Sequence, residues 1–205
     1  MTLASTLTTT LSSDPVVTVV LCFAAYLAGS VLFALPVCRL WKLPDPRAQG
    51  SGNPGATNVY RTGGWAPALT TLALDAAKGW LPVWLAHNLG LSVMAQAIVA
   101  LCAVTGHMIP VFYRFKGGKG VATALGAGLA LAPITTSLMA AIWLLVIWRC
   151  RISALASLIA IVSGPIISAL IEPDTLALFG LLALLIVVRH RNNLIRLAQG
   201  REAGL

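Results

Sequence analysis

Glycines and polar side chains alternate in one short stretch of the chain, residues 50–58, and Arg61 follows. Glycines allow successive backbone N–H groups to point into one concavity, and hydroxyl and amide side chains add donors for an anion. The stretch matches the G-x-G-x-x-G pattern of dinucleotide-binding proteins, but residues 43–46, Leu-Pro-Asp-Pro, supply no strand for a βαβ unit. We therefore interpret residues 50–61 as a phosphate-binding loop; a flexible turn with incidental polarity is the alternative.

A second glycine-rich loop carries two lysines, Lys116 and Lys119, around Gly117 and Gly118. It is not a Walker A loop, because Gly120 follows Lys119 where that motif needs Ser or Thr. Cytoplasmic lysines often only anchor a helix end to lipid headgroups. The glycines favour contact with an anionic ligand instead.

Two pairs of polar residues have helical i, i+3 spacing. His190 and Asn193 share a face at the end of the last apolar run, where they can hold one polar ligand or merely end a span. Asp75 and Lys78 lie inside an apolar run, where an ionisable pair indicates either a functional site or a structural ion pair. Ser153 caps a helix or adds one more phosphate donor. No group of His, Asp and Glu has metal-ligand spacing.

Apolar runs must position these loops. Of the 205 residues, 58 % are hydrophobic and 10 % are charged, whereas soluble domains carry roughly 25 % charged residues. Several runs reach the roughly 20 residues that cross a bilayer as a helix. The composition therefore predicts an all-α membrane protein with a single domain, residues 1–205. We expect the net charge of +8 to orient the chain rather than to bind nucleic acid, because aromatic residues do not alternate with the basic ones.

Charge also predicts the number of spans. The run 120–148 would be about 43 Å long as one helix, beyond the roughly 30 Å hydrocarbon core. Counted as one span, it puts the basic tail after residue 188 opposite the basic residues at 39–61, against the positive-inside rule. A turn at Ala132-Pro133 instead places 13 of the 14 Lys and Arg inside, the fourteenth being the intramembrane Lys78.

We therefore predict a seven-span bundle with a broken or short helix near residues 120–148, the N-terminus outside and the C-terminus in the cytoplasm. Outside would lie Asp14, Glu172 and Asp174. The expected spans are residues 16–38, 65–86, 92–113, 120–131, 134–148, 152–171 and 174–188.

Three segments resemble the PlsY family of bacterial membrane glycerol-3-phosphate acyltransferases, in order and along nearly the whole chain. They are residues 50–61 (GSGNPGATNVYR), 106–123 (GHMIPVFYRFKGGKGVAT) and 189–202 (RHRNNLIRLAQGRE). The resemblance implies a bacterial inner-membrane enzyme with a cytoplasmic active site. It also implies transfer of a fatty acyl group from acyl-phosphate to the 1-hydroxyl of glycerol 3-phosphate, giving lysophosphatidic acid and phosphate.

The resemblance also implies roles for individual residues, and no metal or other cofactor. Around the acyl-phosphate head it places Ser51, Gly52, Asn53, Gly55, Ala56, Thr57, Asn58 and Ser153. Around glycerol 3-phosphate it places Arg61, Lys116, Lys119, His190 and Asn193, and it adds His107 to the catalytic group of Lys119, Arg61, His190 and Asn193. Membrane lipid is an expected partner, and the soluble synthase of acyl-phosphate is a candidate one.

The sequence does not decide which group accepts the proton of the attacking hydroxyl. Neither His107 nor His190 is followed five positions later by Asp, so the H-x4-D dyad of other glycerol-phosphate acyltransferases is missing. We expect the phosphate of the donor to accept the proton, with either histidine as the alternative base. A phosphate or organophosphate transporter is the main alternative function, and a non-enzymatic anchor for a soluble partner is the second.

Overall fold

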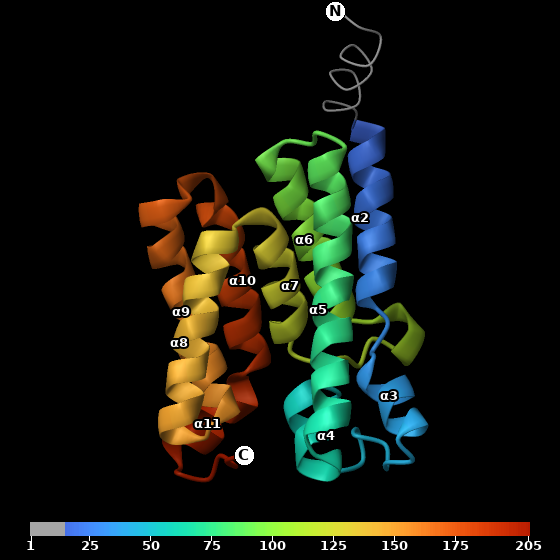
Figure 1. Ribbon diagram of the computed structural model, residues 1–205, viewed down its shortest axis with the longest axis vertical. Helices are drawn as coiled ribbons and strands as arrows, with labels where there is room; N and C mark the ends of the chain where they lie inside the picture. The colour runs from blue at the N-terminus through green and yellow to red at the C-terminus, as the bar shows by residue number, and fades with distance from the viewer. Residues whose placement is uncertain (1–14) are drawn as a thin grey trace, which may run out of the picture.

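The computed structural model describes residues 15–205, and every regular element in this part of the chain is a helix (Figure 1). The predicted all-α membrane fold is confirmed. Asp14 and the predicted outer N-terminus lie outside the described residues. The helices are α2 (Pro15–Gly29), α3 (Ala34–Leu40), α4 (Ala56–Gly63), α5 (Trp65–Asn88), α6 (Val93–Met108), η1 (Val111–Tyr113), α7 (Val121–Leu131), α8 (Pro133–Cys150), α9 (Ser153–Ile171), η2 (Pro173–Thr175), α10 (Leu176–Arg189) and α11 (Arg191–Ala198).

The long helices form two lobes (Figure 1). The first lobe contains α2, α5, α6 and α7, and small residues let its helices approach closely, as they do in other membrane bundles. A Cβ at Gly126 of α7 would collide with the carbonyl of Ala76 on α5, and one at Gly79 of α5 would collide with that of Thr123 on α7. These two contacts hold α7 firmly against α5.

The second lobe contains α8, α9 and α10. Trp143 of α8 donates its indole N–H to Ser157 of α9 over 3.1 Å. The backbone N–H of Thr135, in the first turn of α8, donates to Glu172 Oε2 over 2.8 Å. Glu172 follows α9 directly, so its carboxylate ties the end of α9 to the start of α8.

The predicted break in the run 120–148 is confirmed. Helix α7 ends at Leu131 and α8 begins at Pro133, with Ala132 between them in a non-helical conformation (φ −138°, ψ 73°). Helix α7 has 11 residues and is therefore about 16 Å long, too short to cross a bilayer alone.

The number of membrane crossings stays a prediction. Four helical segments of residues 15–205 are long and apolar enough to span, or five if α10 and α11, which meet at a bend of 63°, form one span. Helices also occupy the remaining two predicted ranges. Helix α5 occupies one of them and has 24 residues, but Asp75 and Lys78 make it less apolar than a usual span. Helix α7 occupies the other and is too short to cross a bilayer alone.

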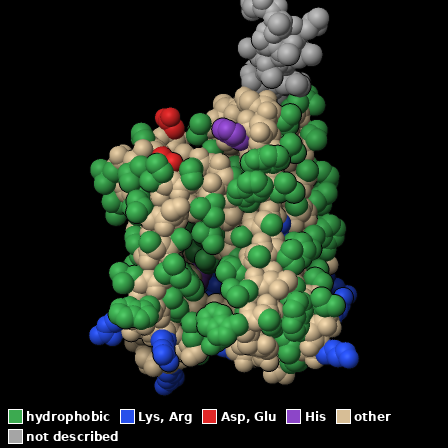
Figure 2. Space-filling model, in the orientation of Figure 1, with side chains coloured by type: hydrophobic (Ala, Val, Ile, Leu, Met, Phe, Trp, Pro, Cys, Tyr) green, Lys and Arg blue, Asp and Glu red, His purple; other side chains and the backbone are tan. Residues whose placement is uncertain are grey.

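Basic side chains gather at one end of the long axis of the molecule. On the face shown in Figure 2, Lys and Arg gather at the end that holds α4, α11 and the C-terminus, whereas acidic side chains lie at the opposite end. The acidic residues of that opposite end, Glu172 and Asp174, flank the turn between α9 and α10. This separation agrees with the charge asymmetry on which the predicted orientation depends.

Candidate active site

A cavity of about 360 Å³ lies between the two lobes, within the range typical of small-molecule sites. Figure 2 shows the surface hollowed there. One end is lined by polar residues of α4, α9 and α11 and of the loops that precede α4 and α7. The other end is lined by apolar side chains of α8, α9 and α10.

Three helix N-termini meet at the polar end. The cavity is lined by Ala56 at the start of α4, by Val121 at the start of α7 and by Ser153 at the start of α9. No side chain caps any of these three helices in the described part of the chain. Helix N-termini carry N–H groups without an intrahelical partner and the positive end of the helix dipole, so three of them at one end of the cavity favour an anion there.

Asn58 stabilises the conformation of the loop before α4. The residue is only 1 % exposed. Its amide nitrogen donates to the carbonyls of Pro46 (2.7 Å) and Gln49 (3.0 Å), and its amide oxygen accepts from the N–H of Ser51 (3.0 Å). Both the nitrogen and the oxygen of the side-chain amide are therefore hydrogen-bonded to the backbone of this loop. Asn58 therefore shapes the loop that presents Ser51 and Asn53 to the cavity.

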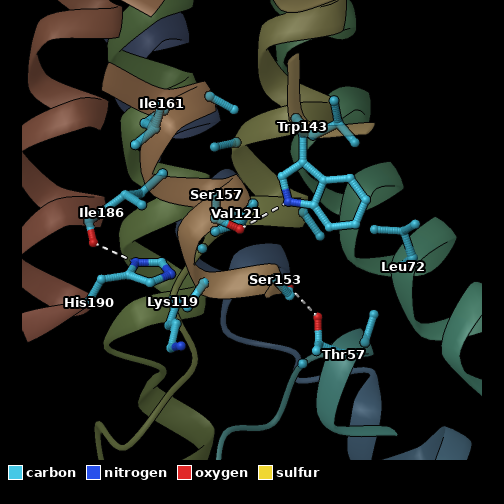
Figure 3. A pocket seen from close by; sticks show the side chains of 18 of the residues that line it. Thr57, Leu72, Lys119, Val121, Trp143, Ser153, Ser157, Ile161, Ile186 and His190 are labelled. Atoms are coloured by element: carbon cyan, nitrogen blue, oxygen red, sulfur yellow. Dashed lines mark hydrogen bonds between the residues drawn. The ribbon is translucent and has the colours of Figure 1, made fainter. Parts of the chain in front are cut away.

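Thr57 and Ser153 join the two lobes at the cavity. Their hydroxyl oxygens are 2.9 Å apart, one on α4 and the other on α9 (Figure 3). Two hydroxyls in contact leave at least one further donor or acceptor between them for a ligand. The structure thus brings together two residues that are 96 positions apart in the sequence.

Lys119 enters the polar end from the loop before α7 (Figure 3). Burial lowers the pKa of its ammonium group to about 8, helped by the positive charges of Arg196, Arg61 and Arg189 and opposed by Glu202. Lys119 is therefore mostly charged at neutral pH. Because burial removes water from the ammonium group, Lys119 is suited to bind a phosphate group.

His190 closes the polar end beside Lys119 (Figure 3). Its Nδ1 lies 2.8 Å from the carbonyl oxygen of Ile186, which can only accept, so Nδ1 carries the hydrogen. Burial and the neighbouring Lys119 lower the pKa of the imidazole to about 4. His190 is therefore neutral at physiological pH, and its Nε2 is left as a hydrogen-bond acceptor.

Asp75, Lys78 and His107 form a buried group on α5 and α6. Lys78 Nζ lies 2.7 Å from Asp75 Oδ1 and 2.8 Å from His107 Nδ1, and it also donates to the backbone carbonyl of Val31. The ammonium therefore forms an ion pair with Asp75 and donates hydrogen bonds to His107 and Val31. Since His107 Nδ1 accepts from this ammonium, its Nε2 carries the ring hydrogen.

The C-terminal segment covers the polar end, which the sequence did not predict. Glu202 lines the cavity and accepts hydrogen bonds from Asn193 and Arg196, both over 2.7 Å. The Arg61 guanidinium donates to the carbonyls of Ala203 (2.9 Å) and Gly204 (3.0 Å). Glu202 is one of the residues of this site that sequence reasoning missed, as is Ser157. An acidic residue in an otherwise basic tail was the available signal.

The apolar end extends away from these groups and opens sideways. Leu72 of α5 and Leu144 of α8 line it and are 36 % and 61 % exposed, so lipid can reach the cavity between the lobes. Trp143 lies between this opening and Ser157 (Figure 3). Phe179 and Met139, both buried, line the cavity at its apolar end. The shape suits an amphipathic ligand with an anionic head.

Most of the predicted site residues line this one cavity: Ser51, Asn53, Gly55, Ala56, Thr57, Asn58, Arg61, Asp75, His107, Lys119, Ser153, His190 and Asn193. Three others do not. Gly52 and Lys116 lie on the exposed sides of their loops, and Lys78 lies behind Asp75 and His107.

An all-helical membrane fold around a cavity with an anionic-ligand end and a lipid-accessible apolar end defines a membrane protein that handles phosphorylated lipids or their precursors. The family model described as glycerol-3-phosphate acyltransferase matches residues 19–200. The chain therefore belongs to this family of membrane acyltransferases, and the predicted PlsY resemblance is confirmed. Membership favours an enzyme over the transporter and the anchor.

Curated relatives and solved structures agree with the family. The glycerol-3-phosphate acyltransferase of Hahella chejuensis is 54 % identical over 181 residues, covering 88 % of this chain and 93 % of the relative. That of Neisseria meningitidis serogroup C is 48 % identical, covering 87 % and 92 %. A crystal structure of PlsY, an integral membrane glycerol 3-phosphate acyltransferase, in its glycerol 3-phosphate form is 36 % identical, has a TM-score of 0.86 and covers 92 % of this chain and 95 % of that one.

Proposed function

We propose that this glycerol-3-phosphate acyltransferase uses acyl-phosphate as its donor and releases lysophosphatidic acid and inorganic phosphate. One observation carries the proposal: three uncapped helix N-termini and Lys119 meet at one end of a cavity whose other end is apolar and open to lipid. Two phosphate groups need this many donors and cations, and a fatty acyl tail needs the apolar end. Solved PlsY structures in a glycerol 3-phosphate form and a lysophosphatidic acid form support the acceptor and the product.

The acyl-phosphate head is assigned to the N-termini of α4 and α9. Ser51, Asn53, Thr57 and Ser153 supply side-chain donors there, and Ala56 supplies a backbone N–H group. Gly55 contributes the close approach of its backbone, because its N–H donates to the carbonyl of Asn53 over 2.9 Å. The acyl chain then extends between α8, α9 and α10 toward the opening between the lobes. This arrangement places the reacting carbonyl between the polar and apolar ends.

Glycerol 3-phosphate is assigned to Lys119, Arg61, His190 and Asn193. Lys119 and Arg61 neutralise its phosphate, and the Nε2 acceptor of His190 is suited to orient a hydroxyl group. Lys116 is exposed and farther from the cavity, which favours a role in attracting the anionic substrate to the loop.

In the reaction, the 1-hydroxyl oxygen attacks the carbonyl carbon, and a new ester bond forms as the carbonyl–phosphate C–O bond breaks. The hydroxyl proton passes to an oxygen of the departing phosphate, which leaves as inorganic phosphate. Lys119 and the helix N-termini stabilise the negative charge that develops on the carbonyl and phosphate oxygens. His107 is unsuited to be the base, because its Nδ1 accepts from Lys78 and its Nε2 is protonated.

The orientation belongs to the same proposal. The cavity's polar end lies at the basic end of the molecule, which the positive-inside rule assigns to the cytoplasm. We propose seven spans in the bacterial inner membrane with this end facing the cytoplasm. Both phosphorylated substrates, and a soluble synthase that supplies the donor, are then on the accessible side.

Purified protein in detergent tests the donor. It is incubated with glycerol 3-phosphate and either acyl-phosphate or acyl-CoA, with no ion gradient present. Lysophosphatidic acid and phosphate should form only from acyl-phosphate. Product formed from acyl-CoA alone would overturn the donor assignment.

A further inference from the structure

Arg189, the last residue of α10, reaches back to the glycine loop that carries Lys119. Its Nη2 donates to the carbonyl oxygens of Gly117 (2.9 Å) and Gly118 (2.8 Å), and its Nε donates to Gly118 (3.1 Å). The planar guanidinium presents several donors in a fixed geometry, which a lysine ammonium does not. Arg189, the first residue of the basic tail after the last predicted span, thus makes specific contacts with a loop about 70 positions away.

The buried group on α5 and α6 holds the same loop from the membrane side. The carbonyl of His107 accepts the N–H of Gly118 over 3.1 Å. A Cβ at Gly118 would collide with Nε2 of the His107 ring, so the loop lies directly against that ring. Lys78 and Asp75 fix the ring in turn through Nδ1 and the ammonium.

We propose that Arg189 is a positioning residue for acyl transfer, clamping Gly117 and Gly118 against His107 so that Lys119 enters the cavity. The inference rests on the proposed function, in which Lys119 contacts a substrate phosphate. Glycine has more conformational freedom to lose than any other residue, so a segment with glycines at 117, 118 and 120 needs fixed partners to hold one shape. Without the guanidinium, the two carbonyls lose their fixed partner and Lys119 loses its defined position.

The test compares Arg189→Met with Arg191→Met. Arg191 lies two residues farther along, is exposed, and has the same charge at the same end of the molecule. A misplacement of about 1 Å can cost roughly 100-fold in rate. We therefore expect Arg189→Met to lower kcat/KM for glycerol 3-phosphate about 100-fold per folded molecule, while Arg191→Met stays close to the starting protein.

Arg189→Lys provides the second comparison. It keeps the charge that helps to anchor α10 in the bilayer, so it reports on the clamp even where Arg189→Met does not accumulate as folded protein. A lysine cannot serve both carbonyls with the geometry of the guanidinium. We expect it to lower kcat/KM about tenfold, the loss of roughly one charged hydrogen bond.

The pH profile distinguishes positioning from general damage to the fold. Activity that needs the Lys119 ammonium falls as pH rises through its pKa of about 8. The charged or titratable groups that act on Lys119 are Arg61, Arg189, Arg196 and Glu202, with His190 beside it. Removing Arg189 takes away a positive neighbour and frees the loop toward water, and both changes raise the pKa of Lys119. The alkaline limb should move to higher pH in Arg189→Met and stay in place in Arg191→Met.

The proposal is overturned if Arg189→Met matches Arg191→Met in kcat/KM and in the alkaline limb, or if Arg189→Lys is fully active. A loss of folded protein that leaves kcat/KM and the limb unchanged would also overturn it. Lys119→Gln separates this failure from that of the proposed function. Full activity of Lys119→Gln would remove the assigned role of Lys119, whereas an inactive Lys119→Gln beside an active Arg189→Met would reject only the clamp.

Discussion

The protonation state of His190 leads to a prediction that separates two roles for this residue. Its Nδ1–H donates to the carbonyl of Ile186, and only Nε2 is available to a substrate. Asparagine carries an amide nitrogen at the level of Nδ1, so His190→Asn can keep the bond to Ile186 while the Nε2 acceptor is lost. The substitution therefore removes one contact with the substrate and preserves the support of the side chain.

The expected size of the effect follows from the role. If Nε2 only orients the 1-hydroxyl, its loss removes one hydrogen bond of roughly 0.5–1.5 kcal/mol, which is about a 3- to 10-fold reduction in rate. If His190 were the general base, its loss would cost roughly 100- to 10,000-fold. Its pKa of about 4 argues for the smaller effect, because such an imidazole is a weak base at neutral pH.

Single-turnover acyl transfer measures the difference directly. Enzyme loaded with acyl-phosphate is mixed with saturating glycerol 3-phosphate, and the ester is followed over time. We expect His190→Asn to be slower by no more than about tenfold. The rate of the starting protein should also show no acidic limb above the pKa of about 4. A loss of 1,000-fold or more at saturation would refute proton transfer to the donor phosphate and identify His190 as the base.

Three further predictions concern contacts between helices. Ser153→Ala removes the partner of Thr57 at the α9 N-terminus, and we expect the KM for acyl-phosphate to rise about tenfold in steady-state assays while the KM for glycerol 3-phosphate is unchanged. Glu172→Ala removes the acceptor for the first turn of α8 and should cost about 1 kcal/mol in thermal unfolding in detergent, whereas Asp174→Ala, an equal loss of charge nearby, should cost little. Gly126→Ala forces a Cβ into the carbonyl of Ala76 and should cost about 1–3 kcal/mol by the same measurement. Its control, Gly180→Ala, fills open space. Equal stability within either control pair would contradict the corresponding contact.

Hydropathy and charge were sufficient to predict the apolar helices, but not the short helices α4 and α11. The run 120–148 illustrates this, because its length and its proline could not decide between one helix and two, while the positive-inside rule favoured a break that the structure has at Ala132. The rule works because the free energy of placing Lys and Arg depends on the side of the membrane and not on packing. It needs no knowledge of tertiary contacts.

The site was only partly predictable, because its residues come from distant segments. The i, i+3 spacing of Asp75 and Lys78 was sufficient to predict their ion pair, which is local to α5. The contact of Lys78 with His107 depends on how α5 packs against α6, and no spacing within either helix contains that information. Glu202 was missed for the same reason, since its partners are set by the path of the C-terminal segment and not by a motif.

The fold shows how two lysines, Lys78 and Lys119, are accommodated in a largely apolar protein, which the sequence alone does not. A buried cation is costly unless it is paired and hydrogen-bonded, and Lys78 meets both conditions through Asp75, His107 and Val31. Among residues 15–205, no carboxylate lies so close to Lys119, and the charges around it are mostly positive. The charge of Lys78, which lies outside the cavity, is therefore neutralised by Asp75. The charge of Lys119, which lies in the cavity, is poorly compensated. An anion that enters the cavity can supply the charge compensation that Lys119 lacks within the protein, which is the physical basis for the phosphate site proposed at the polar end.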